Sequence, residues 1–280
     1  MIKKTTMDYK KMIGLGVAGN VAGHLDQAGE SGGFQNTKDG EADAPKGIFP
    51  FYLPAKTDKC FGVYPYSSST ISYPSKGENV QIEPELAIIC SIKYENQLVK
   101  SLTPISFGAF NDCSIRKMAA DKLSEKKNWG PNSKGISDTI IEIDEFSKGG
   151  ILDNYNIVAY LRRNGVLHPY GCNIPISDYS YIYEQLLSWI VAKMNTQTDE
   201  GPLECIHDLI QQAEYPDHAL IGIGATNYTD FGKKCFLKAG DEGFVVVYSK
   251  QDYNLNQIET LLKSNTLTGK DISILHQTVR

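Results

Sequence analysis

The sequence lacks the features that mark membrane, secreted and nucleic-acid-binding proteins. None of its apolar stretches approaches the roughly 20 residues needed to cross a bilayer. The start of the chain is basic, but no apolar segment follows it, so we do not expect a secretory signal. The 280 residues carry a net charge of −5 without any basic block, which argues against nucleic acid and anionic membrane as partners.

Cysteine is also sparse, and its spacing is irregular. The six cysteines stand at positions 60, 90, 113, 172, 205 and 235. No pair has the short spacing of a zinc site, and the set does not suggest a disulfide framework. We therefore expect reduced thiols, several of them core fillers, in a cytoplasmic protein.

What the sequence does contain is many short strand patterns and few helical ones. Asn164-Gly165, between the apolar stretches 156–163 and 166–170, predicts a two-residue β-hairpin. The clearest helical spacing covers Asp178 to Met194, and a shorter helix is expected over 203–214. No internal repeat is visible. This pattern favours an all-β or β-rich fold.

Two glutamates stand at the head of the most continuous apolar run. Glu83 and Glu85 precede Leu86-Ala-Ile-Ile-Cys90, which is typical of a buried strand. Residues i and i+2 of a strand face the same side, so the two carboxylates would converge. Like charges at the mouth of a buried strand repel unless a cation lies between them, and oxygen ligands suit Mg²⁺, Mn²⁺ or Ca²⁺ better than zinc. The alternative is a solvated strand end with two surface glutamates.

A glycine-rich stretch lies near the N-terminus. Gly14-Leu-Gly16-Val-Ala-Gly19 matches the dinucleotide fingerprint, but the apolar stretch before it is short and no strand-helix-strand rhythm follows. A short strand followed by a turn and a helical turn near 20–28 is the favoured interpretation. Residues 29–47, rich in glycine and charge, predict a surface loop that either is merely solvated or acts as a lid.

Five motifs, in order along the chain, resemble those of the fumarylacetoacetate hydrolase family. They are Asn20-Val-Ala-Gly-His24, Glu83-Pro-Glu85-Leu-Ala-Ile-Ile, Asn111-Asp-Cys-Ser-Ile-Arg116, Trp129 followed by Ser133-Lys134-Gly135, and Ile223-Gly224-Ala-Thr226 followed by Phe236-Leu-Lys-Ala-Gly-Asp241. Each motif alone is weak, and their shared order carries the resemblance.

The resemblance implies a β-rich α+β fold, a mixed β-roll or sandwich with a few peripheral helices. It implies a single catalytic domain over 1–280, with a lid-like segment at about 14–47, a core at about 48–250 and a polar C-terminal extension at 251–280. Relatives on this scaffold are usually dimers, so a homodimer is expected.

The resemblance also implies the site. Glu83, Glu85 and Asp112 would bind Mg²⁺, or Mn²⁺ or Ca²⁺, which leaves open positions for a chelating dicarbonyl substrate. The resemblance also implies that Lys134 is a catalytic and substrate-binding residue and that His24 is the general base. Without the resemblance, Lys134 would be interpreted as a surface lysine and His24 as a helix-cap or surface residue.

Three more residues are expected around the substrate. Thr226, with Gly224 beside it, would offer its hydroxyl and backbone N–H to a substrate carboxylate, and Arg116 would brace the site more than touch substrate. The expected partner is a small anionic keto acid. The expected activity is a hydrolase or decarboxylase that cleaves a carbon–carbon bond through a metal-stabilised enolate.

Departures from the family pattern indicate a divergent subfamily. Gln27 replaces the acid that lies three residues after the histidine in many members, with Asp26 and Glu30 as nearby substitutes. The usual Arg-Asp becomes Arg116-Lys117. Without a carboxylate partner an imidazole is less well oriented and less basic. An isomerase or tautomerase on the same scaffold, or a non-catalytic metabolite-binding protein, therefore remains an alternative.

Overall fold

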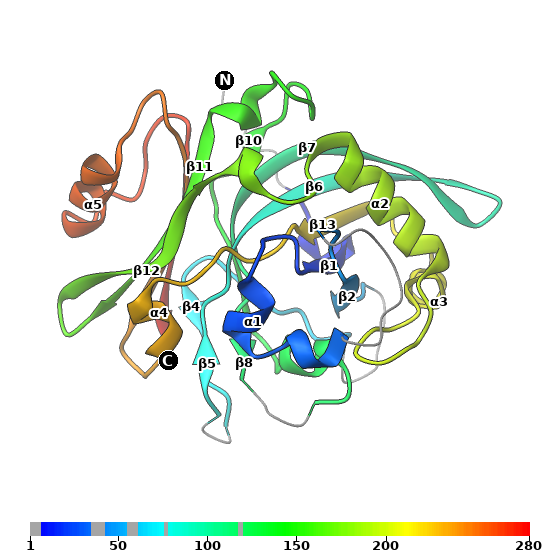
Figure 1. The fold of residues 1–280 in the computed structure, drawn as a ribbon, viewed down its shortest axis with the longest axis horizontal. Helices are drawn as coiled ribbons and strands as arrows, with labels where there is room; N and C mark the ends of the chain where they lie inside the picture. Colours follow the sequence, from blue (N-terminus) through cyan, green and yellow to red (C-terminus); the bar gives the residue numbers. More distant parts are fainter. Residues whose placement is uncertain (1–6, 35–42, 55–60, 76–77, 117–119) are drawn as a thin grey trace.

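The computed structural model describes residues 7–34, 43–54, 61–75, 78–116 and 120–280. Cys60, Lys117 and part of the expected glycine-rich loop (35–42) lie outside the described residues. Two sheets dominate the fold, and the larger one curls so that its strands β6 and β7 arch over β13, β1 and β2 (Figure 1). The helices lie around these sheets, so the β-rich α+β prediction is confirmed.

The larger sheet has eight strands and mixes parallel with antiparallel pairs. In spatial order they are β2 (Gly47–Tyr52), β1 (Ile13–Ala18), β13 (His218–Gly222), β6 (Pro84–Glu95), β7 (Leu98–Asn111), β9 (Lys134–Ile136) and β3 (Tyr66–Ser67), with β10 (Ile141–Glu142) paired to β7. The predicted strand after Glu85 is the buried half of β6, which lies between β13 and β7. Burial on both faces explains why its sequence is a continuous apolar run.

The second sheet has five strands, and a two-stranded ribbon stands apart. The five are β12 (Val166–Pro175), β11 (Tyr155–Arg163), β14 (Glu242–Ser249), β15 (Ile272–Val279) and β4 (Thr70–Ile71); the ribbon pairs β5 (Val80–Gln81) with β8 (Ser114–Ile115). The predicted hairpin joins β11 to β12, where Asn164 and Gly165 both have positive φ, as a primed turn requires.

The C-terminal residues are part of the core rather than a polar extension. Strand β15 pairs along its length with β14, and its side chains from Ile272 to Leu275 are buried. The polar residues within 272–279 obscured this strand, because Ser273 and Gln277 are polar yet buried. The Ser273 hydroxyl donates to the Thr139 carbonyl, and the Gln277 amide donates to carbonyls of residues 67 and 70.

Five α-helices and five short 3-10 helices occur among the described residues. The α-helices are α1 (His24–Ala28), α2 (Tyr183–Thr196), α3 (Ile206–Gln212), α4 (Asp230–Lys234) and α5 (Leu255–Lys263); the 3-10 helices are η1 (Tyr9–Lys11), η2 (Ser31–Phe34), η3 (Leu123–Lys126), η4 (Ile151–Asn154) and η5 (Ile176–Asp178). The expected long helix is α2, which packs Leu186, Ile190 and Met194 against the large sheet at β7. None of the described helices has the length and apolar character to span a membrane.

The first residues of the expected lid-like segment belong to the sheet. Strand β1 pairs in parallel with β13 and antiparallel with β2, and all six of its residues are buried. The glycine pattern at 14–19 therefore supplies a core strand and the turn after it. Helix α1 follows that turn, and in Figure 1 it lies below the arch of the large sheet.

Candidate metal centre

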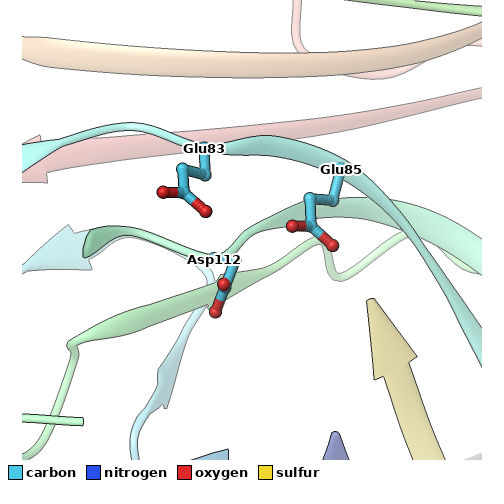
Figure 2. A group of neighbouring side chains, drawn as sticks. All are labelled: Glu83, Glu85 and Asp112. Atoms are coloured by element: carbon cyan, nitrogen blue, oxygen red, sulfur yellow. The ribbon is translucent and has the colours of Figure 1, made fainter. Parts of the chain in front are cut away.

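Glu83, Glu85 and Asp112 lie together at one end of the β6–β7 pair. The antiparallel register pairs Pro84 with Asn111, which places Glu83 beside Asp112, and the Asp112 N–H donates to the Glu83 carbonyl at 3.0 Å. A ligand oxygen from each carboxylate lies within 4.8 Å of the others. Figure 2 shows both glutamates projecting from the same side of one strand, with Asp112 next to them. The i, i+2 spacing thus has the effect that the sequence predicted.

Strand β13 makes room for the second glutamate. A Cβ at Gly222 would lie 2.3 Å from Glu85 Oε2, so a side chain there would displace the carboxylate. Two residues later the Gly224 N–H donates to the same Oε2 at 3.1 Å, with Gly224 at φ +116°, a conformation that L side chains rarely adopt. The glycines of this turn therefore fix Glu85 in place. Gly224 was expected beside the substrate, and its N–H donates to the carboxylate cluster.

Lys127 places its ammonium between two of the three carboxylates. Its Nζ lies 2.7 Å from Glu83 Oε2 and 2.6 Å from Asp112 Oδ2, and the side chain is 2% exposed. The lysine caps the C-terminal end of η3, and its Nζ lies 4.8 Å from the centre of the Phe49 ring. Nothing in the sequence around Lys127 indicates this position, because a lysine in a charged connecting segment is usually solvated.

Lys134 contacts the cluster from strand β9. Its Nζ is fully buried, 2.9 Å from Asp112 Oδ1, and donates to the Cys113 carbonyl at 2.6 Å. Strand β9 pairs with β7, which brings Lys134 beside the residue that follows β7. Burial lowers the pKa of Lys134, and the nearby Lys127 lowers it further, while Asp112 opposes both.

Arg116 joins the cluster to its surroundings. Its NH1 lies 2.8 Å from Glu83 Oε1 and 3.2 Å from Glu30 Oε1, and its Nε donates to Gln81 Oε1 at 2.6 Å. Its NH2 donates to the Tyr228 hydroxyl at 2.6 Å. Every guanidinium nitrogen has a protein partner, which suits bracing and leaves no nitrogen free for substrate.

The cations divide the three carboxylates into two kinds. Burial alone would raise the pKa of Glu83, but Lys127 and Arg116 hold it well below its usual range. Glu85 has no ion pair with any of the described residues, and burial together with repulsion from Asp112 and Glu83 raises its pKa well above the usual value. The buried charge of Glu85 is therefore the one that the protein does not balance.

His24 lies beside the cluster without a carboxylate partner. It is 5% exposed, and its ring centre is 5.4 Å from that of Tyr228. Burial lowers the pKa of His24 to about 4, helped by the positive charges of Arg116 and Lys127, so the ring is neutral at pH 7. Its Nδ1 has no hydrogen-bond partner among the residues the structure describes.

Of the two candidate acids near His24, Asp26 is exposed and Glu30 is engaged elsewhere. Gln27 accepts a hydrogen bond from the Tyr228 N–H at 2.8 Å, and Glu30 pairs with Arg116 and, at 3.5 Å, with Lys126. Glu30 therefore does not restore the acid that Gln27 replaces. It neutralises cations on the outer side of the site.

Thr226 is placed differently from the expectation in one respect. Its N–H donates to the Pro84 carbonyl at 3.0 Å, so this donor is not available to a substrate. Its hydroxyl is fully buried and has no hydrogen-bond partner among the described side chains and backbone. Only the hydroxyl remains as a candidate contact.

The carboxylate cluster fits a divalent cation by its donor chemistry. It offers three hard oxygen ligands, and Glu83 Oε1 and Asp112 Oδ1 are buried without a hydrogen bond from the described residues, although Arg116 and Lys134 lie within ion-pair distance. The buried Glu85 carboxyl, which no cation of the described residues neutralises, also favours a bound divalent cation. The cations Lys127, Lys134 and Arg116, which already pair with Glu83 and Asp112, oppose it.

The architecture defines the class of the protein. The chain superimposes on Cg1458 in complex with an inhibitor with a TM-score of 0.57, at 18% identity, over 95% of this chain and 76% of the other. It is also similar to apo 2-keto-3-deoxy-D-arabinonate dehydratase (TM-score 0.53, 15% identity, 96% and 72% coverage). A third similar structure, from Oleispira antarctica, is assigned as a fumarylacetoacetate isomerase/hydrolase (TM-score 0.52, 12% identity, 96% and 93% coverage). The fold is that of the fumarylacetoacetate hydrolase-like proteins.

Residues 30–279 match the model of a family of unknown function, DUF5718, and the chain belongs to that family. No protein of curated function matches the sequence.

Proposed function

We propose that the protein is an enzyme that breaks a carbon–carbon bond in a small keto acid through an enolate, with decarboxylation the reaction its site suits best. The observation that carries this proposal is the convergence of Glu83, Glu85 and Asp112 in a buried cluster beside the Lys134 ammonium. The similar structures include a keto-acid dehydratase, which supports a keto acid as the substrate class.

In this proposal Glu83, Glu85 and Asp112 hold a divalent cation, with Mg²⁺ the first candidate and Mn²⁺ or Ca²⁺ as alternatives. When bound, such a cation polarises a carbonyl and stabilises negative charge on its oxygen. Lys134 adds a positive charge at the same place, and the Thr226 hydroxyl donates to the substrate carboxylate. Burial of the cluster excludes water and strengthens these interactions.

Decarboxylation requires only what these residues supply. The bond to the departing carboxylate breaks, its electron pair moves onto the carbonyl as an enolate, and CO₂ leaves. The enolate carbon then takes a proton from solvent. No step requires an activated water molecule, whereas hydrolysis does. His24 lacks the carboxylate partner that would orient it for water activation, which makes hydrolysis the less favoured reaction.

The second candidate is an isomerase or tautomerase, which the state of His24 favours. A neutral imidazole with an unpartnered Nδ1 can take a proton from the carbon next to a carbonyl and return it to another atom. This reaction also passes through an enolate and needs no water attack.

A comparison of three proteins tests the proposal. We expect the wild type with Mn²⁺ to release CO₂ from oxaloacetate or a related β-keto acid, and Glu83→Gln to lower turnover at least about 100-fold, because one metal ligand and its charge are lost. His24→Ala should lower CO₂ release less than about tenfold. CO₂ release and the exchange of substrate hydrogens in D₂O are measured together.

The alternatives give different results in the same assay. Loss of exchange in His24→Ala, with no CO₂ release by the wild type, identifies the isomerase. If the wild type neither releases CO₂ nor promotes exchange with any small keto acid tested, the enzyme proposal is wrong and the metabolite-binding alternative takes its place.

Substrate entry requires the cover of the cluster to open, because Glu83, Glu85 and Asp112 are each at most 3% exposed. Helix α1 carries His24 to the cluster and is the part of the expected lid-like segment that we propose to move. The homodimer remains a prediction from the family resemblance.

A further inference from the structure

The Lys127 ammonium occupies a place in the cluster where a metal ion would otherwise bind. It contacts Glu83 and Asp112, two of the three candidate ligands, at 2.6–2.7 Å and is almost completely buried. The family resemblance assigns no role to this residue. Its position therefore calls for an explanation of its own.

Two of the three candidate ligands already have cation partners without any metal. Glu83 pairs with Lys127 and Arg116, and Asp112 pairs with Lys127 and Lys134, whereas no ion pair joins Glu85 to the described residues. A divalent cation at Glu83 and Asp112 therefore adds positive charge to carboxylates that cations already neutralise. A metal bound to either carboxylate shared with Lys127 also lies within a few ångströms of the ammonium, where like charges repel strongly because the site is buried.

We infer that Lys127 is a resident cation that competes with the divalent metal for Glu83 and Asp112, so that the metal enters as the ammonium leaves. This inference rests on the proposed metal centre. Lys127 then has two positions. Its ammonium lies between the two carboxylates when the metal is absent and is withdrawn from them when the metal is bound.

The position of Lys127 allows its side chain to turn away from the cluster, and another carboxylate lies outside the cluster to attract it. It lies at the end of the short helix η3 rather than within a sheet strand, so its side chain can turn without breaking a strand pair. Glu30, which pairs with Lys126 and Arg116, also attracts Lys127. Glu30 is thus the carboxylate outside the cluster toward which the displaced ammonium turns. Lys134, fixed in β9 and hydrogen-bonded to the Cys113 carbonyl, stays in place.

Titration calorimetry with Mn²⁺ tests the competition. We expect Lys127→Met to bind Mn²⁺ at least about tenfold more tightly than the wild type, because the competing charge is gone. Without metal the variant should melt at a lower temperature, since Glu83 and Asp112 lose their shared cation. Added Mn²⁺ should raise its melting temperature more than that of the wild type.

Lys126→Met is the matched control. It removes the same charge from the adjacent position, but Lys126 faces Glu30 at 3.5 Å rather than the metal ligands. We expect its Mn²⁺ affinity to stay within about threefold of the wild type. An equal gain in both variants means that general charge, not the position of Lys127, sets the affinity, and it overturns the inference.

The outcomes separate the inference from the function on which it rests. If the wild type and Lys127→Met bind Mn²⁺ with the same affinity, the metal centre stands and the competition is wrong. If neither binds, the metal centre itself is wrong.

Amine labelling of the wild type covers the case in which Lys127→Met does not fold. Acetylation of Lys127, followed by mass spectrometry, should rise several-fold when Mn²⁺ is added, while acetylation of Lys134 stays low. Unchanged labelling of Lys127 at saturating Mn²⁺ overturns the inference.

Discussion

Asp112→Asn is expected to lower the free energy of unfolding by about 3–5 kcal/mol, because it leaves buried charges without their partner. Asp112 is fully buried and pairs with Lys127 at 2.6 Å and Lys134 at 2.9 Å. An asparagine keeps the shape but presents a neutral amide to two buried ammonium groups. Urea denaturation at pH 7 without divalent metal measures the loss.

Glu95→Gln provides the control for that loss. Glu95 pairs with Lys100 at 2.9 Å, and both side chains are exposed. Exposed pairs of this kind contribute little, so the change should stay within about 0.5 kcal/mol. A loss below about 1 kcal/mol for Asp112→Asn would mean that the buried ion pairs do not stabilise the fold as described.

Glu85→Gln is expected to change stability in the opposite direction. In the part of the chain that the structure describes Glu85 has no cation partner, and burial and its two neighbouring carboxylates raise its pKa well above the ordinary value. A glutamine removes the buried acid while its oxygen can still accept the hydrogen bond from Gly224. Without metal we expect a gain of about 1–3 kcal/mol at pH 8.

The pH dependence fixes the sign of this effect. A raised pKa means that the folded protein holds the proton at pH values where the unfolded chain has released it. The contribution of Glu85 to the stability of the wild type therefore falls as pH rises above the ordinary pKa of 4.5. The gain from Glu85→Gln should be near zero at pH 4 and grow toward pH 8. Lower stability of the variant at pH 8 without metal contradicts the assignment of Glu85 as the unbalanced charge.

Metal reverses the comparison between Glu85→Gln and the wild type. Saturating Mn²⁺ should raise the melting temperature of the wild type by mass action and have little effect on Glu85→Gln, which has lost one ligand. A protein that gains stability on losing a buried glutamate, and at the same time loses its response to metal, has that glutamate in a metal centre.

Glu83 and Glu85 could be predicted from the residues themselves because their geometry is local, whereas Asp112 was implied by the family resemblance. Glu83 and Glu85 share a face by strand periodicity, and Asp112 follows the strand that pairs next to theirs. The buried apolar run after Glu85 identified the central strand for the same reason. These features depend on neighbours in the chain or on one hairpin.

Lys127 and the C-terminal strand could not be predicted, because they depend on distant contacts. Lys127 reaches Glu83 from 44 residues away, and nothing in its own segment distinguishes it from a solvated lysine. Gln27 is bound by the backbone of Tyr228, 201 residues further along the chain. In β15, buried Ser273 and Gln277 find their partners in other elements, so the segment looked polar.

Anomalous diffraction from crystals soaked in Mn²⁺ tests the central claim, that Glu83, Glu85 and Asp112 form a metal centre. We expect an anomalous peak coordinated by all three carboxylates, with the Lys127 ammonium withdrawn from Glu83 and Asp112. Absence of a peak at saturating Mn²⁺, with Lys127 still bridging the two carboxylates, contradicts the claim.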